Sequence, residues 1–239
     1  MKIIQAIGSL SFLLYLYASI ALFGILILFA PLLFFFPGLQ YEIARLWARS
    51  VLLVLKISCG LEHEIIGLEN LPKDNCIILS KHSSTWETIS LMTLLPRQTW
   101  VIKKEILFFP IFGQLLLFFK PIPIDRNAGK NAVQQIISKG EERLNNGLFV
   151  VIFPEGTRTS FPFAGRYGLG GSILSIHSGY PVVPIAHNAG KYWPRNTIIK
   201  KRGKITVQIG QAIYTSKEDD PEKISKSVKE WIEKKIVKF

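Results

Sequence analysis

The chain has 239 residues, of which 49% are hydrophobic and 19% charged, so it can build one domain with a sizeable core and is not a disordered chain. Two cysteines are too few for a disulfide framework or a zinc cluster. The formal net charge of +12 leaves four classes of partner: nucleic acid, an anionic membrane, phosphorylated metabolites or an acidic carrier protein.

The amino terminus is strongly apolar. No charged residue occurs in residues 3–41, and residues 10–36 are almost wholly apolar. About 20 such residues suffice to cross a bilayer as a helix. The next segment, Tyr41–Ser58, carries charges among apolar residues, which is typical of an amphipathic or partly inserted helix. We therefore expect residues 1–60 to form a membrane-embedded anchor, either one spanning helix or a hairpin in one leaflet.

The orientation of this anchor follows from its flanking charges. Arg45, Arg49 and Lys56 follow the apolar run, whereas only Lys2 precedes it. Basic residues are retained preferentially on the cytoplasmic side of a membrane. The remainder of the protein is therefore expected on the cytoplasmic face.

From residue 61 onward, short apolar runs alternate with helix-like segments. This alternation predicts an α/β domain over residues 61–239, with a mixed, largely parallel sheet covered by helices. The predicted strands are Glu64–Gly67, Cys76–Ser80, Trp100–Ile102, Pro121–Asp125, Leu148–Phe153, Pro181–Ala186 and Ile205–Ile209. The predicted helices are Ser84–Leu95, Lys104–Phe118, Ala128–Asn145, Gly171–Ser178 and Pro221–Val237.

The last predicted helix has clear end signals. Asp220 suits the N-cap, and Pro221 suits the first helical position. The apolar stripe of this amphipathic helix lies opposite a lysine-rich face. A solvated surface explains any single lysine, but the cluster as a whole is expected to face anionic lipid.

Reactive side chains follow four of the predicted strands. In open α/β sheets such groups gather just beyond the carboxyl ends of the strands. One imidazole, several carboxylates and several cations are therefore expected along one rim. They lie in the segments Lys81–Glu87, Lys103–Glu105, Asp125–Asn127 and Phe153–Arg158.

His82 is the candidate general base, because a neutral imidazole can take a proton from an alcohol that attacks a carbonyl. Glu87, five residues on, could orient it and stabilise the imidazolium. Alternatively, Ser84 and Glu87 form only a capping box at the start of a helix. No serine or cysteine nucleophile is well placed, so direct transfer to a bound hydroxyl is expected. Neither a metal nor a cofactor is expected, since the remaining histidines show no ligand spacing.

The segment Glu155–Arg158 is predicted to form a tight turn after an apolar strand. Gly156 would let the backbone approach a ligand, and the Arg158 guanidinium can bind phosphate oxygens in a forked geometry. Lys103 and Arg126 could add positive charge from neighbouring strands. The alternative is a local ion pair between Glu155 and Arg158 on the surface.

Four segments together resemble the ordered blocks of the glycerolipid acyltransferases, in particular the 1-acylglycerol-3-phosphate acyltransferases. They are His82 with its acidic residue at 87, Ile124–Arg126, Phe153–Arg158 and Val183–Ile185. The resemblance covers roughly residues 61–200, and the apolar amino terminus is similar to the membrane-embedded helices of that family. Four blocks in order are far more specific than any one of them.

This resemblance implies a glycerolipid acyltransferase-like fold in a bacterial-type inner membrane. It also implies transfer of a fatty acyl group from acyl carrier protein or coenzyme A to the sn-2 hydroxyl of lysophosphatidic acid, giving phosphatidic acid in phospholipid biosynthesis. His82 would be the base and Glu87 its orienting carboxylate, although the family usually has aspartate at position 87. The implied acceptor-phosphate site comprises Glu155, Gly156, Thr157 and Arg158, with Lys103 and Arg126 as supporting cations.

Two other functions stay open at this point. The acceptor could be another lyso-lipid, such as a lyso-ornithine lipid or a different lysophospholipid. The chain could also be a lipid-binding protein that keeps the fold without the chemistry. Nucleic-acid binding fits less well, because the basic residues follow no known binding module.

Overall fold

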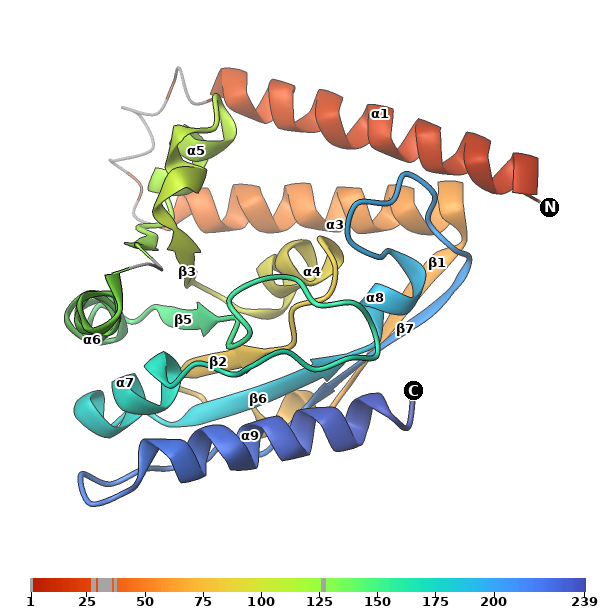
Figure 1. The fold of residues 1–239 in the computed structure, drawn as a ribbon. Coiled ribbons are helices and arrows are strands. Elements are labelled where there is room, and N and C mark those ends of the chain that lie inside the picture. The colour runs from red at the N-terminus through yellow and green to blue at the C-terminus, as the bar shows by residue number, and fades with distance from the viewer. Residues whose placement is uncertain (1, 27–28, 30–35, 37, 126–127) are drawn as a thin grey trace.

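A computed structural model describes residues 2–26, 29, 36, 38–125 and 128–239. Its centre is a seven-stranded sheet with the order β1-β7-β6-β2-β5-β3-β4 (Figure 1). All neighbouring strands are parallel except β6 and β7, which confirms the predicted mixed, largely parallel sheet. The strands are β1 (Leu61–Ile66), β2 (Ile77–Ser80), β3 (Gln98–Lys103), β4 (Ile122–Ile124), β5 (Phe149–Ile152), β6 (Val182–His187) and β7 (Gly203–Ile209).

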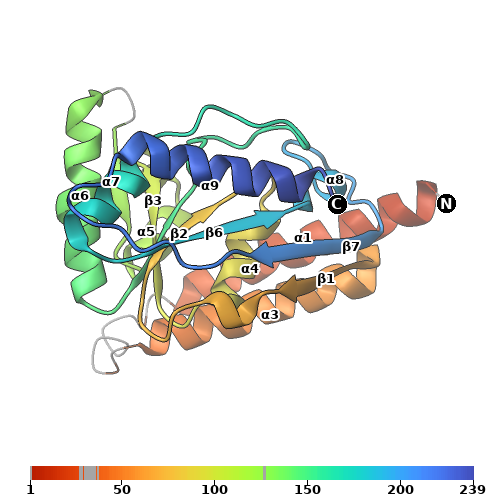
Figure 2. The same ribbon diagram turned by 90° about the horizontal axis from the view of Figure 1, so that it is seen from below.

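Helices cover both faces of this sheet (Figures 1 and 2). One face carries α1 (Lys2–Leu26), α3 (Leu39–Cys59), α4 (Trp86–Leu94) and α5 (Phe112–Leu117), and the other carries α6 (Lys130–Asn145), α7 (Gly170–Ser178) and α9 (Pro221–Ile236). Three short helices, η2 (Leu68–Asn70), η3 (Lys104–Phe108) and α8 (Ala189–Tyr192), lie in connections.

The single helix predicted over residues 104–118 is wrong, because the chain breaks into η3 and α5. Phe109 precedes a proline and takes the extended conformation that this position favours. Pro110 has no amide hydrogen to continue a helix, and Ile111 adopts a positive φ of 64°. The two short helices therefore meet at a sharp corner.

The central strands β2 and β5 are buried on both faces, which explains why all their residues except Ser80 are apolar. Successive side chains of β2 point to opposite sides. Ile77 and Leu79 pack in the core beneath α6, α7 and α9, whereas Ile78 packs in the core beneath α3 and α4. The carboxyl ends of β2, β5 and β6 meet at one edge because these three strands are parallel.

The helices α1 and α3 lie side by side along the domain (Figure 1). The hydroxyl of Tyr15 donates to the Ser50 hydroxyl at 2.8 Å, and the Trp47 indole donates to the Ser19 hydroxyl at 3.0 Å. The stretch Ile3–Ile25 is long and apolar enough to cross a membrane, yet only 22% of it is buried. The two prolines that follow this stretch, Pro31 and Pro37, lie outside the described residues.

The carboxyl-terminal helix α9 begins as predicted. The Asp220 carboxylate accepts the Glu222 amide at 2.8 Å, and Pro221 occupies the first turn. Val228, Ile232 and Ile236 of this helix pack in the core on the sheet side. Across the sheet from α9 lie α1 and α3 (Figures 1 and 2). The lysine-rich face of α9 therefore points away from the side that α1 occupies, and the arrangement gives no support to the expected contact of both with one lipid surface.

Candidate active site

The predicted dyad joins the loop after β2, which carries His82, to the first turn of α4, which carries Glu87. His82 Nδ1 lies 2.9 Å from Glu87 Oε1, and the same oxygen accepts the backbone amides of Ser83 at 3.0 Å and Ser84 at 2.9 Å. Glu87 therefore both orients the imidazole and holds the backbone before α4. Only half of the suggested capping box forms, because the Ser84 hydroxyl accepts the Trp86 amide at 3.1 Å and Thr85 is the N-cap of α4. Since a carboxylate only accepts, Nδ1 carries the hydrogen and Nε2 is the ring nitrogen able to take up a proton.

Glu87 is ionised despite its burial. Its side chain is 1% exposed. Burial acts to raise the pKa of Glu87, but the neighbouring His187, the bond from His82 and the Ser84 amide together outweigh it and leave this pKa below its ordinary value. A carboxylate in this state can stabilise a positive charge on the His82 ring.

Two further contacts fix the position of His82. Its ring stacks on the ring of Phe153, with centroids 4.1 Å apart and planes inclined by 15°. Its carbonyl oxygen accepts the Thr159 amide at 2.8 Å. Both partners lie in the loop after β5, so that loop and the His82 loop are held together.

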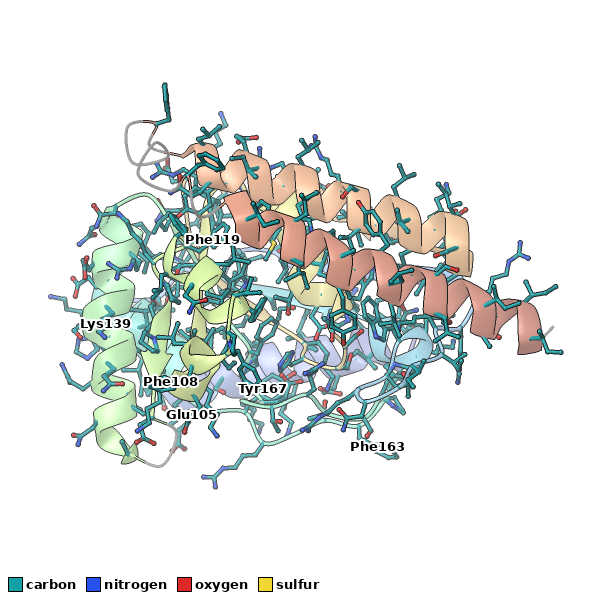
Figure 3. The ribbon with its side chains drawn as sticks, turned by 90° about the horizontal axis from the view of Figure 1, so that it is seen from above. Glu105, Phe108, Phe119, Lys139, Phe163 and Tyr167 are labelled. Atoms are coloured by element: carbon teal, nitrogen blue, oxygen red, sulfur yellow. The ribbon has the colours of Figure 1, made fainter. Side chains whose placement is uncertain are left out.

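A buried ionic network lies behind this loop. Lys81 Nζ is 3.0 Å from Glu155 Oε1 and 3.4 Å from Glu233 Oε1 of α9, and it donates to the Phe163 carbonyl at 2.9 Å. The Tyr167 hydroxyl donates to the same Glu233 oxygen at 3.2 Å. Phe163 and Tyr167 belong to the long loop between β5 and α7 (Figure 3).

In this network the Glu155 carboxylate is buried and paired with Lys81. Neither the Lys81 nor the Glu155 side chain is exposed. Burial raises the pKa of Glu155, and the positive charge of Lys81 opposes that rise. The suggested surface ion pair between Glu155 and Arg158 is therefore wrong. No role is predicted for Lys81 from the sequence, although a lysine directly after a strand that is buried throughout is a signal for a buried partner.

Arg158 lines the cavity beside His82, whereas Glu155 is directed into the protein toward Lys81. Its Nη1 donates to the Thr85 hydroxyl at 2.8 Å, a neutral partner that leaves the guanidinium charge for an anion. Gly156 has a φ of 70°, which favours glycine, and a Cβ there would meet no atom within 4 Å. Thr157 is exposed and accepts from Arg195 at 3.4 Å.

The other predicted cations are less central. Lys103 ends β3, is about half exposed, and lies 3.5 Å from the Glu105 carboxylate. It does not line the cavity beside His82. Arg126 lies outside the described residues. Among the residues that the structure describes, no three His, Cys, Asp or Glu side chains gather where they could hold a metal ion.

A mainly apolar cavity of about 260 Å³ extends from His82 beneath the amino-terminal helices. Its polar lining is His82, Ser84, Thr85, Thr88 and Arg158. The rest of the lining is apolar and comes from α1, α3, α4, α5, η3, β3 and the residue after β5: Leu16, Ile20, Trp47, Ile89, Met92, Trp100, Val101, Ile102, Ile106, Phe112, Leu116 and Phe153. The sequence gives no sign that α1 contributes to this wall.

Comparisons with known proteins agree with this geometry. Residues 62–188 match the acyltransferase family. A 1-acyl-sn-glycerol-3-phosphate acyltransferase of Pseudomonas aeruginosa is 42% identical, over 91% of this chain and 85% of the relative. A chloroplastic 1-acyl-sn-glycerol-3-phosphate acyltransferase of Brassica napus is 30% identical, over 75% of this chain and 52% of the relative.

A solved structure shares the fold. The 1-acyl-sn-glycerophosphate acyltransferase of Thermotoga maritima superposes with a TM-score of 0.80 at 19% identity, covering 99% of this chain and 96% of the other. The fold, the ordered motifs and the similarity over nearly the whole chain lead to one assignment. The chain belongs to the 1-acyl-sn-glycerol-3-phosphate acyltransferases, a family of acyl-transferring enzymes.

Proposed function

We propose that the protein transfers a fatty acyl group from a thioester, carried by acyl carrier protein or coenzyme A, to the sn-2 hydroxyl of lysophosphatidic acid. The product is phosphatidic acid, an intermediate for phospholipid synthesis. The observation that carries this proposal is the His82–Glu87 pair at an apolar cavity whose polar lining includes Arg158. The names of the relatives support the choice of acceptor.

The reaction follows from the proton positions. His82 Nε2 takes the proton of the acceptor hydroxyl as that oxygen attacks the thioester carbonyl carbon. The imidazolium is stabilised by the ionised Glu87 at 2.9 Å. When the carbon–sulfur bond breaks, the imidazolium returns its proton to the leaving thiolate, so a free thiol and the new ester result.

Arg158 is assigned to the acceptor phosphate, because it lines the cavity and has a neutral partner in Thr85. Gly156 and Thr157, in the same turn, would offer backbone and hydroxyl donors. Glu155 is assigned a different part in this site, since its buried bond to Lys81 holds the turn rather than the ligand. Lys103 and Arg126 stay supporting cations in the proposal.

The membrane is proposed to contact one side of the molecule. On α1, Ile3, Leu14 and Leu22 are more than 60% exposed. The same helix is hydrogen-bonded to α3 through Tyr15 and Ser19, and to the domain through Ser9. This packing favours a hairpin in the cytoplasmic leaflet of the inner membrane over a spanning helix. The exposed Phe108 of η3 extends this apolar surface beside α5 (Figure 3).

The exposed face of α3 combines basic and apolar side chains. Arg49 and Lys56 are exposed there among Leu46, Leu53 and Ile57. Such a face suits the boundary between anionic head groups and acyl chains. We therefore assign contact with anionic lipid to α3.

The experiment is an acyl-transfer assay with the full chain in detergent, labelled acyl donors on both carriers, and a panel of lyso-lipid acceptors. Lysophosphatidic acid is expected to be the preferred acceptor. His82→Ala serves as the control and should lose about 100- to 10,000-fold in turnover, the usual cost of removing a general base. Preference for a lyso-ornithine lipid or another lysophospholipid would reassign the acceptor. Turnover with none of them would favour a lipid-binding protein.

A further inference from the structure

The two oxygens of the Glu87 carboxylate differ in their hydrogen bonding. Oε1 accepts hydrogen bonds from the His82 ring and from two backbone amides. Oε2 is buried and has no hydrogen-bond partner among the described residues. A buried oxygen of an ionised carboxylate is costly unless a positive group or dipole lies near. One such group is the Nε2 atom of His187, which lies 3.9 Å from Oε2.

His187 is the last residue of β6 and is 1% exposed. Two backbone groups fix its tautomer. Nε2 lies 2.8 Å from the Lys81 carbonyl oxygen, and Nδ1 lies 3.3 Å from the Ala189 amide nitrogen. A carbonyl only accepts and an amide only donates, so Nε2 carries the hydrogen and Nδ1 carries none. The ring is therefore neutral, and burial lowers its pKa in agreement with that state.

The Nε2–H group of His187 lies close to two acceptors, the Lys81 carbonyl oxygen and Glu87 Oε2. It donates to the carbonyl of Lys81, the residue that precedes His82, and lies on the Oε2 side of Glu87. At 3.9 Å the second contact is too long for a hydrogen bond, but an oriented dipole acts strongly in a buried, weakly polar environment. The titratable groups around His187 are Glu87 from α4 and Lys81 and His82 from the loop after β2.

We propose that His187 is a positioning residue for the reaction, forming a His82–Glu87–His187 arrangement in which its fixed Nε2–H supports the far oxygen of Glu87. This inference rests on the proposed acyl transfer only for its kinetic consequence. His187 does not exchange a proton in the reaction, because both of its ring nitrogens are held by backbone groups. Its effect is to lower the proton affinity of the His82–Glu87 pair through the dipole that it places beside Glu87 Oε2.

The test uses four full-length variants in detergent. His187→Phe keeps a ring but removes the N–H group. His187→Gln can place an amide donor near the former Nε2 position, whereas His187→Asn is too short to reach the Lys81 carbonyl. His63→Phe is the matched control, because His63 packs edge-on against Trp86 at 5.5 Å and the His187 ring lies 6.2 Å from that same Trp86 ring.

The first measurement is an NMR titration of the histidine rings, which needs no turnover and is tractable because the chain has only four histidines. Losing the nearby dipole should make the dyad bind its proton more readily. The His82 signal should therefore titrate at higher pH in His187→Phe and His187→Asn, and close to wild type in His187→Gln and His63→Phe. Coincident His82 titrations in all five proteins would overturn the proposal, even if the enzyme proved inactive.

The second measurement is kcat and KM across pH, with whichever acceptor the wild-type protein uses. His187→Phe and His187→Asn should lower kcat about tenfold or more, leave both KM values unchanged, and move the acid limb of the kcat profile to higher pH. His187→Gln should recover most of the rate. A fall in kcat with no movement of the acid limb, or the same fall in His187→Gln, would show a merely structural role. An inactive wild-type protein would refute the proposed function, and the titration would still decide the role of His187.

Discussion

A single carboxylate oxygen holds the candidate base and the first turn of the helix that carries it. Because Glu87 Oε1 accepts from His82, Ser83 and Ser84, the charge of this residue and its hydrogen-bonding geometry can be separated by substitution. Glutamine keeps the acceptor oxygen and removes the charge, whereas aspartate keeps the charge and shortens the reach.

Glu87→Gln is expected to lower kcat by about 100-fold or more, because an amide cannot stabilise the imidazolium. Glu87→Asp should keep substantially more activity, since it retains the charge. Steady-state turnover at neutral pH measures both, and thermal unfolding checks that both variants are folded. A fully active Glu87→Gln enzyme would show that this residue only caps α4.

Arg158→Lys tests the acceptor-phosphate assignment. Lysine keeps the charge but loses the forked donor geometry, which should cost about 1.5–3 kcal/mol, or roughly 10- to 150-fold. The KM for lysophosphatidic acid should rise by more than the KM for the acyl donor. Arg166→Lys is the control, because Arg166 is an exposed arginine in the same loop. Equal, small effects on both substrates would contradict the assignment.

At the scale of elements, α1 is tied to the segment before β7 by a buried lysine. Lys200 Nζ lies 5.5 Å from the Phe12 ring and 5.0 Å from the Trp193 ring, and its backbone amide donates to the Ser9 hydroxyl at 2.9 Å. The Phe12 and Trp193 rings meet edge-on at 5.2 Å. This contact holds the first half of α1 against the domain.

Burial lowers the pKa of Lys200 from 10.5 to about 8. Between these values the unfolded chain binds a proton that the folded protein has released, so the folded state gains stability as the pH rises. The unfolding free energy of the wild type, relative to Lys200→Met, should therefore increase from about pH 8 to pH 10.5. Denaturation of both proteins in detergent across this range measures the difference. A difference that is constant with pH would contradict the shifted titration.

Over the whole molecule, the two basic helical surfaces lie on opposite faces of the sheet. The exposed basic residues of α3 share a face with apolar side chains, whereas those of α9 lie across the sheet (Figure 2). In the proposed arrangement, only one of these surfaces can rest on the leaflet that receives α1. The proposed orientation selects α3.

Replacing Arg49 and Lys56 together by glutamine should weaken binding to anionic vesicles and reduce its dependence on salt. Basic residues near a charged leaflet contribute about 1 kcal/mol each. The matched control replaces four exposed lysines of the carboxyl-terminal region and should leave vesicle binding unchanged: Lys223, Lys226, Lys234 and Lys238. Vesicle sedimentation at two salt concentrations measures both. Release by the control alone would reverse the proposed orientation.

The sequence predicts elements better than it predicts partners. The strands β2 and β5 are predictable because strands buried on both faces are nearly continuous apolar runs. The dyad is predictable because His82 and Glu87 lie only five residues apart, His82 in the loop after β2 and Glu87 in the first turn of α4. The ion pair between Glu155 and Lys81 is not predictable, because the two residues lie far apart in the sequence and meet only when β2 and β5 pair. The contribution of α1 to the cavity is not predictable either. A helix that is apolar on every side has no sequence pattern to indicate which of its residues face the protein.

That contribution gives the proposed membrane anchor a second role as part of the cavity wall. Leu16 and Ile20 of α1 form part of the wall around the cavity that begins at His82. A truncated variant that lacks α1 would lose part of the cavity wall as well as the proposed membrane attachment. Detergents or lipid mimetics that displace α1 are therefore expected to disturb the cavity itself. A loss of activity on purification would then reflect damage to the site as well as loss of membrane attachment.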